Sequence, residues 1–200
     1  MTKKYFLFLL ILTVSFYGQT KEAIIYFKDG TSIKGLGMIK KANEFASFRS
    51  QDKILFRITE NDKPDLWTSE DVKGITFFDF ENSRVMEFLK VDKYEKVELL
   101  EVITDGTVKL YKQTKIVDNY LPSNNGNFES GGMIKTEVEA YYLKRGSEEY
   151  PTKIKDNYIK STSKYFSDCE LLVQKIKNHE FTFDTLDKLV NFYNDICSGE

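Results

Sequence analysis

The hydrophobic pattern of this 200-residue chain changes its period once, and this change constrains the fold more than any other feature. Up to about residue 146, apolar and polar residues alternate in short runs, as they do on the two faces of a β-strand. From about Thr152 onward, apolar residues recur at helical spacing along one face. The sequence therefore predicts an α+β protein, in which a β-rich region at 19–146 precedes a helical region at 147–200 that packs on it as one unit.

Two tight turns are predicted in the β-rich region. Asp29-Gly30 and Asp105-Gly106 each separate apolar runs, and Asp-Gly is a strong hairpin signal because the turn needs a positive φ that glycine tolerates. After the first turn, Gly35 and Gly37 interrupt the return strand, as at a bulge or a barrel corner. These features suggest an antiparallel β-rich body made of a small SH3-like or Sm-like barrel and a meander.

Further strands are expected wherever the alternation returns. The aromatic content of 14% supports this interpretation, because Phe and Tyr suit half-buried sheet surfaces. The expected strands are 23–27, 54–59, 73–80, 85–91, 97–103, 108–111 and 136–143. Polar stretches at 61–70 and 118–132 are expected to be loops, and a loop as long as the second is either functional or mobile.

Three helices are predicted in the C-terminal region. The first places Ile154, Tyr158 and Tyr165 on one face. The second is predicted to begin with a capping box, in which Ser167 is the N-cap and Glu170 follows three residues later. The third is expected to open near Asp184 and to carry apolar residues at helical spacing as far as Ile196.

The two cysteines, Cys169 and Cys197, lie at the start of the second predicted helix and at the end of the third. A short connection makes these helices antiparallel neighbours, so both cysteines are expected at the same end of the helical pair. A structural disulfide is therefore predicted, with a stabilisation of roughly 3 to 4 kcal/mol from the closed loop. Two free, buried thiols are the alternative.

The first 18 residues have the order of a secretory signal peptide. Lys3 and Lys4 precede an apolar run from Tyr5 to Val14, and small residues follow it. This run is shorter than the roughly 20 residues that a spanning helix needs. We therefore expect cleavage, a secreted or periplasmic location that permits the disulfide, and no transmembrane segment afterwards. A retained signal that acts as an anchor is the alternative.

No motif indicates a catalytic residue, a metal site or a cofactor. His179 is the only histidine, whereas zinc sites and Ser-His-Asp triads need further partners. It is expected to cap a helix C-terminus or to be solvated. Asp118 and Glu129 have the spacing of calcium-loop ends, but Tyr120 and Pro122 occupy ligand positions. A calcium hand is therefore rejected, and a looser cation site in this loop remains an alternative.

The charge balance and the aromatic residues bear on possible partners. The formal net charge is −2, with no basic stripe that would follow a phosphate backbone, so nucleic acid is not expected as a partner. Trp67, Tyr141 and Tyr142 are candidate ligand contacts, because they could form an aromatic platform for a sugar or a peptide. Ordinary core and surface roles are the alternative for these three residues.

The layout resembles a group of uncharacterised secreted bacterial proteins that combine an Asp-Gly β-hairpin region with a cysteine-containing pair of C-terminal helices. The segments that carry this resemblance are Lys28-Asp29-Gly30, Ile33 to Gly37, Tyr165-Phe166-Ser167-Asp168-Cys169 and Phe192-Tyr193-Asn194. The resemblance covers most of the chain after the signal, through loose motifs. It implies no activity.

Together these observations predict a non-catalytic binding or interaction module of the bacterial envelope, whose partner is an envelope protein, a peptide or a glycan. A secreted carboxylate-dependent hydrolase is one alternative, and it would require a cleft with two acids, one of them with a raised pKa. An envelope assembly or holdase factor is the other, and it would require a contiguous exposed apolar groove.

Overall fold

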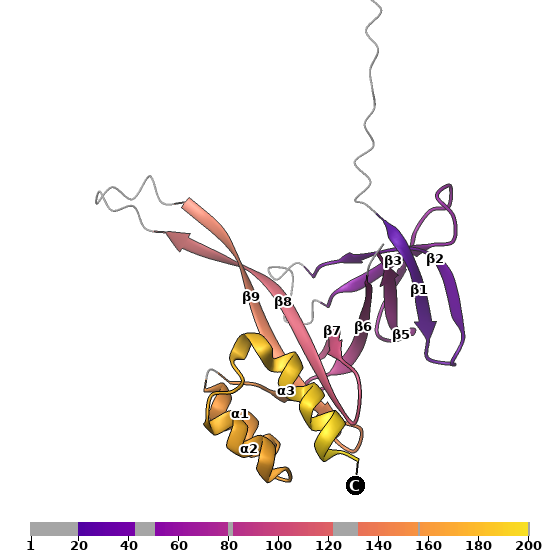
Figure 1. Cartoon of the computed structure of the whole chain (residues 1–200). Helices are drawn as coiled ribbons and strands as arrows, with labels where there is room; N and C mark the ends of the chain where they lie inside the picture. The colour runs from indigo at the N-terminus through magenta and orange to yellow at the C-terminus, as the bar shows by residue number, and fades with distance from the viewer. Residues whose placement is uncertain (1–19, 43–50, 80–81, 122–131, 156, 200) are drawn as a thin grey trace, which may run out of the picture.

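The computed structural model describes residues 20–42, 51–79, 82–121, 132–155 and 157–199. These residues form one ten-stranded antiparallel sheet and a C-terminal set of helices (Figure 1). The strands are β1 Lys21–Phe27, β2 Ser32–Lys40, β3 Lys53–Arg57, β4 Asp65–Trp67, β5 Val72–Phe78, β6 Ser83–Lys90, β7 Val97–Thr104, β8 Val108–Leu121, β9 Gly132–Arg145 and β10 Thr152–Lys153. The helices are α1 Tyr158–Tyr165, α2 Glu170–Lys177 and α3 Leu186–Phe192, with a 3-10 turn at Phe183–Thr185 before α3 and a π-helical turn at Tyr193–Cys197 after it.

The strand order is β10-β9-β8-β7-β6-β5-β1-β2-β3-β4, and each neighbouring pair is antiparallel. The α+β class is therefore confirmed. The SH3-like or Sm-like barrel is not confirmed, because the first strands continue into one open sheet. Its edges are β4 and β10, which are 3 and 2 residues long, and such short edges offer little template for pairing with another chain.

The first predicted turn forms as expected. Gly30 has a φ of +92°, and the Asp29 side chain accepts a hydrogen bond from the main-chain N–H of Thr31 at 2.8 Å. β1 and β2 then pair without a register shift past Gly35 and Gly37. The bulge in this region lies elsewhere, between Tyr26 and Phe27 where β1 pairs with β5.

Two hydrophobic cores lie on one face of the sheet, which we call the helix face. Directly paired residues on neighbouring strands have their side chains on the same face. The pairs Met86–Glu101, Glu101–Lys112 and Lys112–Tyr141 therefore place Met86 of the first core on the same face as Tyr141, which packs against the second core. The first core is built by β1, β3, β5, β6 and β7, with Ile25, Ile54 and Ile75 fully buried. Between the cores, Glu101 forms an ion pair with Arg84 at 3.0 Å and lies 3.8 Å from Lys112.

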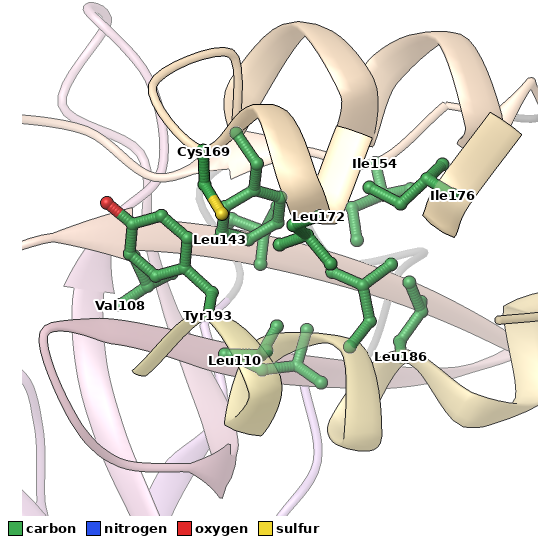
Figure 2. Close-up of a cluster of buried hydrophobic side chains, with 12 residues drawn as sticks. Val108, Leu110, Leu143, Ile154, Cys169, Leu172, Ile176, Leu186 and Tyr193 are labelled. Carbon is green, nitrogen blue, oxygen red and sulfur yellow. The ribbon is translucent and has the colours of Figure 1, made fainter. Parts of the chain in front are cut away.

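The second core joins the helices to β8 and β9 (Figure 2). Its buried residues are Val108, Leu110, Leu143, Ile154, Phe166, Cys169, Leu172, Ile176, Leu186, Leu189, Val190 and Tyr193. At roughly 1.5–3 kcal/mol for each large aliphatic or aromatic side chain buried, this core supplies most of the free energy that holds the helices on the sheet. In the part of the chain that the structure describes, no helix is long and apolar enough to cross a membrane.

Several predicted boundaries were wrong. Residues 65–67 form β4 within the expected loop, and residues 118–121 and 132 of the second expected loop belong to the 14-residue strands β8 and β9. Residues 122–131 of that loop, with Glu129, lie outside the described residues, as do residues 1–18 with the predicted signal.

The predicted start of the second helix was also wrong. The N-cap of α2 is Cys169, and it makes no side-chain capping hydrogen bond, so Ser167 does not cap this helix. The chain instead makes a turn before the helix, in which the main-chain N–H of Cys169 donates to the Phe166 carbonyl oxygen at 3.0 Å, and Asp168 accepts hydrogen bonds from Arg145 and Tyr193. Side-chain capping is found elsewhere, where Asn157 Oδ1 accepts from the main-chain N–H of Lys160 at 3.0 Å at the start of α1.

Candidate functional site

The face of the sheet opposite the helices carries a hollow formed by β1, β5 and β6. Three direct pairs, Tyr26–Gly74, Gly74–Glu87 and Glu87–Leu100, place these side chains on one face. We call this the open face, because its small buried cluster of Leu100, Tyr111 and Tyr142 contains no helix residue. The hollow on it, which we call the sheet hollow, has a volume of about 680 Å³, within the range of small-ligand sites.

Gly74 of β5 lines the sheet hollow without adding a side chain to it. A Cβ atom built on Gly74 would lie 2.0 Å from the main-chain oxygen of Met86, so β5 and β6 approach each other here as only glycine allows. The register shift between β1 and β5 leaves Lys73 as an extra residue, and this bulge bends β5 at the same point. Apolar side chains of Tyr26, Val85 and Leu89 surround the gap, and Tyr26 is 37% exposed.

One carboxylate, Glu87, stands in the wall of the sheet hollow. It accepts hydrogen bonds from the Tyr111 hydroxyl at 2.7 Å and from Lys109 Nζ at 3.1 Å, and Lys109 also pairs with Asp105 at 3.1 Å. Burial, followed by the hydrogen bond to Glu87, raises the pKa of Tyr111 well above its usual range. Burial alone would lower the pKa of Lys109, but its hydrogen bonds to Glu87 and Asp105 outweigh this and raise it. Tyr111 therefore stays neutral and Lys109 stays charged at physiological pH.

The rim of the sheet hollow is positively charged. Lys28, Lys73 and Lys90 line it, and Glu87 is the one acid among the lining residues that the structure describes. Lys90 pairs with the exposed Glu95 at 3.0 Å, whereas Lys28 and Lys73 form no ion pair with any described residue. Neither histidine nor cysteine is among the described lining residues. The arrangement is suited to holding an apolar group with a nearby negative charge.

A smaller hollow of about 350 Å³ lies further along the open face, where β8 leaves β7. Glu98 is 14% exposed there and contacts Lys96 at 2.7 Å and Lys115 at 3.3 Å. Burial would raise the pKa of Glu98, but the hydrogen bonds and charges of the two lysines outweigh burial and lower it. Glu98 in this smaller hollow is thus paired within the protein.

The structure does not bring together the three aromatic residues expected to form a platform. Trp67 lies on β4 and packs edge-on against Phe27, with ring centroids 5.1 Å apart, at the border of the first core. Tyr141 faces the helices, packs edge-on against Phe183 and donates to Glu139 at 2.8 Å. Tyr142 faces the opposite way.

The environment of Tyr142 is that of a core residue. It is 8% exposed, and its hydroxyl donates to Gln113 Oε1 at 3.2 Å. Tyr141 and Tyr142 are neighbours in one strand, and adjacent residues of a strand point to opposite faces, so the two rings cannot offer one surface.

The predicted cysteine pair forms a disulfide. Cys169 and Cys197 are bonded, with their Cα atoms 5.8 Å apart, and the bond joins the start of α2 to the end of the π-helical turn after α3. His179 is exposed just beyond α2, where it adopts a left-handed conformation with a φ of +59°. In the part of the chain that the structure describes, no cluster of three or more His, Cys, Asp or Glu residues could hold a metal ion.

Beside the disulfide lies a polar network that the sequence did not reveal. Arg145 Nη2 donates to Asp168 Oδ1 at 2.9 Å, and the guanidinium lies 4.9 Å from the centre of the Tyr165 ring. Tyr193 donates to Asp168 Oδ2 at 2.6 Å. The network joins β9 to α1, to the α1–α2 connection and to the last helical turn, so its evident role is to fix the helices on the sheet. No family model, curated protein or solved structure matches this chain.

Proposed function

We propose that this chain is a non-catalytic binding module of the bacterial envelope or extracellular space, and that the sheet hollow binds its partner. The observation that supports the proposal is the composition of the hollow. Tyr26, Val85 and Leu89 provide an apolar surface, and Lys28 and Lys73, which pair with no described acid, lie at its rim. A partner segment that combines an apolar side chain with a carboxylate is complementary to this surface, as in an acidic peptide stretch of an envelope protein.

The same surface favours binding over acid-base catalysis. Glu87 is the one acid among the described lining residues, and both of its donors belong to the protein. A glycosidase-type mechanism uses a pair of acids, one with a raised pKa. Among the described residues, every carboxyl group whose pKa is displaced, namely Asp29, Asp62, Glu98 and Asp168, has it lowered.

Site-specific photo-cross-linking in the producing cells tests the proposal. A photo-reactive phenylalanine analogue replaces Tyr26, which borders the sheet hollow, or Tyr94, which is 79% exposed and does not line it. Both changes replace one aromatic side chain by another, so the two variants are matched. We expect a discrete cross-linked species from position 26 that is absent at position 94.

A blocking variant makes the result specific. Val85→Glu places a carboxylate in the sheet hollow, where it repels an acidic segment, and it is expected to abolish the cross-link from position 26. Identical cross-linking from both positions, or a cross-link that persists in the Val85→Glu variant, would refute binding in this hollow.

A further inference from the structure

A third hollow lies between β10 and α1, and we call it the lysine hollow. Its volume is about 630 Å³, and four lysines line it: Lys153, Lys155, Lys160 and Lys164. Lys153 and Lys155 come from β10 and the residues after it, and Lys160 and Lys164 from α1. The remaining described lining residues are Thr152, Asn157, Ser161 and Tyr165, so no acid is among them.

The four positive charges are not neutralised by described residues. None of these lysines forms an ion pair within the described part of the chain, whereas Lys109, Lys112 and Lys115 on β8 all do. The lining residue Tyr165 donates its hydroxyl to Glu148 at 2.7 Å, and Glu148 also accepts from the main-chain N–H of Arg145 at 2.8 Å. Asp156 lies outside the described residues.

The helix α1 concentrates this charge on one side. Asn157, Lys160, Ser161 and Lys164 are spaced by three and four residues, so they lie on one face of the helix. Like charges four residues apart repel each other in a helix, and Lys155 adds to the repulsion from the neighbouring edge, whereas Lys153 pairs with Tyr142 and shares the open face with it. In a chain with a formal net charge of −2, such a cluster lowers its free energy when an anion enters.

The residue types indicate which anion fits. Lysine presents a compact point charge, whereas recognition of a planar carboxylate commonly uses the two-pronged donor set of arginine. No arginine is among the described lining residues. Attraction by ammonium groups alone increases with the charge density of the ligand, which is high for phosphate groups. A hollow of this volume also holds more than one phosphate.

We propose that the lysine hollow binds a ligand that carries several phosphate groups. This site is independent of the sheet hollow, because the two share no described lining residue. The ligand is either a soluble polyphosphorylated compound or the phosphate headgroups of a lipid surface, which present the same chemistry.

Titration calorimetry with inorganic tripolyphosphate tests the proposal on the purified protein. We expect saturable binding that weakens as salt is added. The Lys160→Gln/Lys164→Gln variant should bind at least about tenfold more weakly, because half of the cations are removed. The Lys177→Gln/Lys188→Gln variant has the same net charge and loses two exposed lysines outside the hollow, and it should bind as the unmodified protein does. Lys160→Arg/Lys164→Arg should retain binding, because the charges are kept.

Three results would overturn the proposal: no binding of tripolyphosphate, an equal loss in both glutamine variants, or equally tight binding of citrate. Co-sedimentation with vesicles distinguishes the two sources of phosphate. If phosphatidylglycerol vesicles sediment the protein, phosphatidylcholine vesicles do not, and the Lys160→Gln/Lys164→Gln variant stays in solution, the lipid headgroup is the ligand. If tripolyphosphate binds and neither vesicle does, the ligand is soluble.

Discussion

The Asn194 side chain pairs with both main-chain groups of Val108. Its Oδ1 accepts from the Val108 N–H at 2.9 Å, and its Nδ2 donates to the Val108 carbonyl oxygen at 2.9 Å. The two residues are 86 positions apart, yet Asn194 acts on the start of β8 as a neighbouring strand would. A Cβ atom on Gly106 would lie 2.4 Å from Asn194 Nδ2, so this contact also requires a small residue in the β7–β8 turn.

Asn194→Asp is therefore expected to destabilise the protein by roughly 1–3 kcal/mol, because a carboxylate oxygen replaces the donor that faces the Val108 carbonyl. Urea unfolding followed by circular dichroism measures the change in the free energy of unfolding. Asn191→Asp introduces the same chemical change at an exposed position of α3 without a side-chain partner among the described residues, and it should change stability far less. Equal effects of the two variants would contradict the role assigned to Asn194.

Asp168 should make stability depend on pH. Burial would raise the pKa of Asp168, but the hydrogen bonds from Tyr193 and Arg145 outweigh burial, so the pKa lies below its ordinary value. A carboxyl group with a lowered folded-state pKa stabilises the fold above its unfolded-state pKa, and this stabilisation is lost as the pH falls through the folded-state value. Because the Asp168 side chain is 49% exposed, we expect this stabilisation to be about 1 kcal/mol at neutral pH.

Asp168→Asn should accordingly be less stable than the unmodified protein at pH 7, and the difference should shrink below about pH 4. Thermal unfolding across this pH range measures it, with Asp195→Asn as the control at an exposed acid of the C-terminal helical segment. A difference that stays constant with pH would show that Asp168 does not act through its charge.

Features that depend on a local pattern could be predicted from the sequence. The α+β class follows from the change of hydrophobic period, and the first turn follows from glycine at position 30, whose φ is positive in the structure. The disulfide follows from the place of each cysteine on short neighbouring helices. In contrast, β8 continues past Tyr111 through the polar run 112–115, and it is a strand there because β9 pairs with it over its whole length.

The candidate sites depend on register, which no local pattern records. Tyr26, Gly74 and Glu87 come from three strands, and only the pairing of β1 with β5 and of β5 with β6 makes them neighbours. Part of the lysine hollow could be predicted from the sequence, because Lys160 and Lys164 have the four-residue spacing of one helix face. The other half depends on the pairing of β10 with β9, which involves two residues of each strand and could not be predicted.

The disulfide should stabilise the helical region strongly. Its cysteines are 28 positions apart, and closing a loop of this size is worth about 3 to 4 kcal/mol in the chain-entropy model. Cys169→Ser/Cys197→Ser should lower the free energy of unfolding by this amount. The reduced, unmodified protein should behave like the double variant, and a double variant as stable as the oxidised protein would contradict the prediction.

His179 offers a way to raise stability. Its left-handed conformation, with a φ of +59°, follows the end of α2, where glycine is preferred because it has no Cβ. His179→Gly should therefore stabilise the protein by about 1 kcal/mol, measured as an increase in the midpoint of thermal unfolding. Asn178→Gly is the control, because Asn178 has an ordinary φ of −81° and glycine there should destabilise. A lower midpoint for His179→Gly would contradict this account.

Gly74 connects the stability of the sheet with the sheet hollow. A Cβ at this position would overlap the main-chain oxygen of Met86, 2.0 Å away, and main-chain atoms between two paired strands cannot move without breaking the ladder. Gly74→Ala is therefore expected to cost more than about 3 kcal/mol, beyond the usual range for a single substitution. Gly146→Ala is the matched control, because a Cβ at Gly146 would meet no heavy atom within 4 Å and the residue does not have a positive φ; it should leave stability unchanged within about 0.5 kcal/mol. A soluble Gly74→Ala variant with unchanged stability would show that β5 and β6 do not approach each other this closely, and the hollow they form would then lose its structural basis.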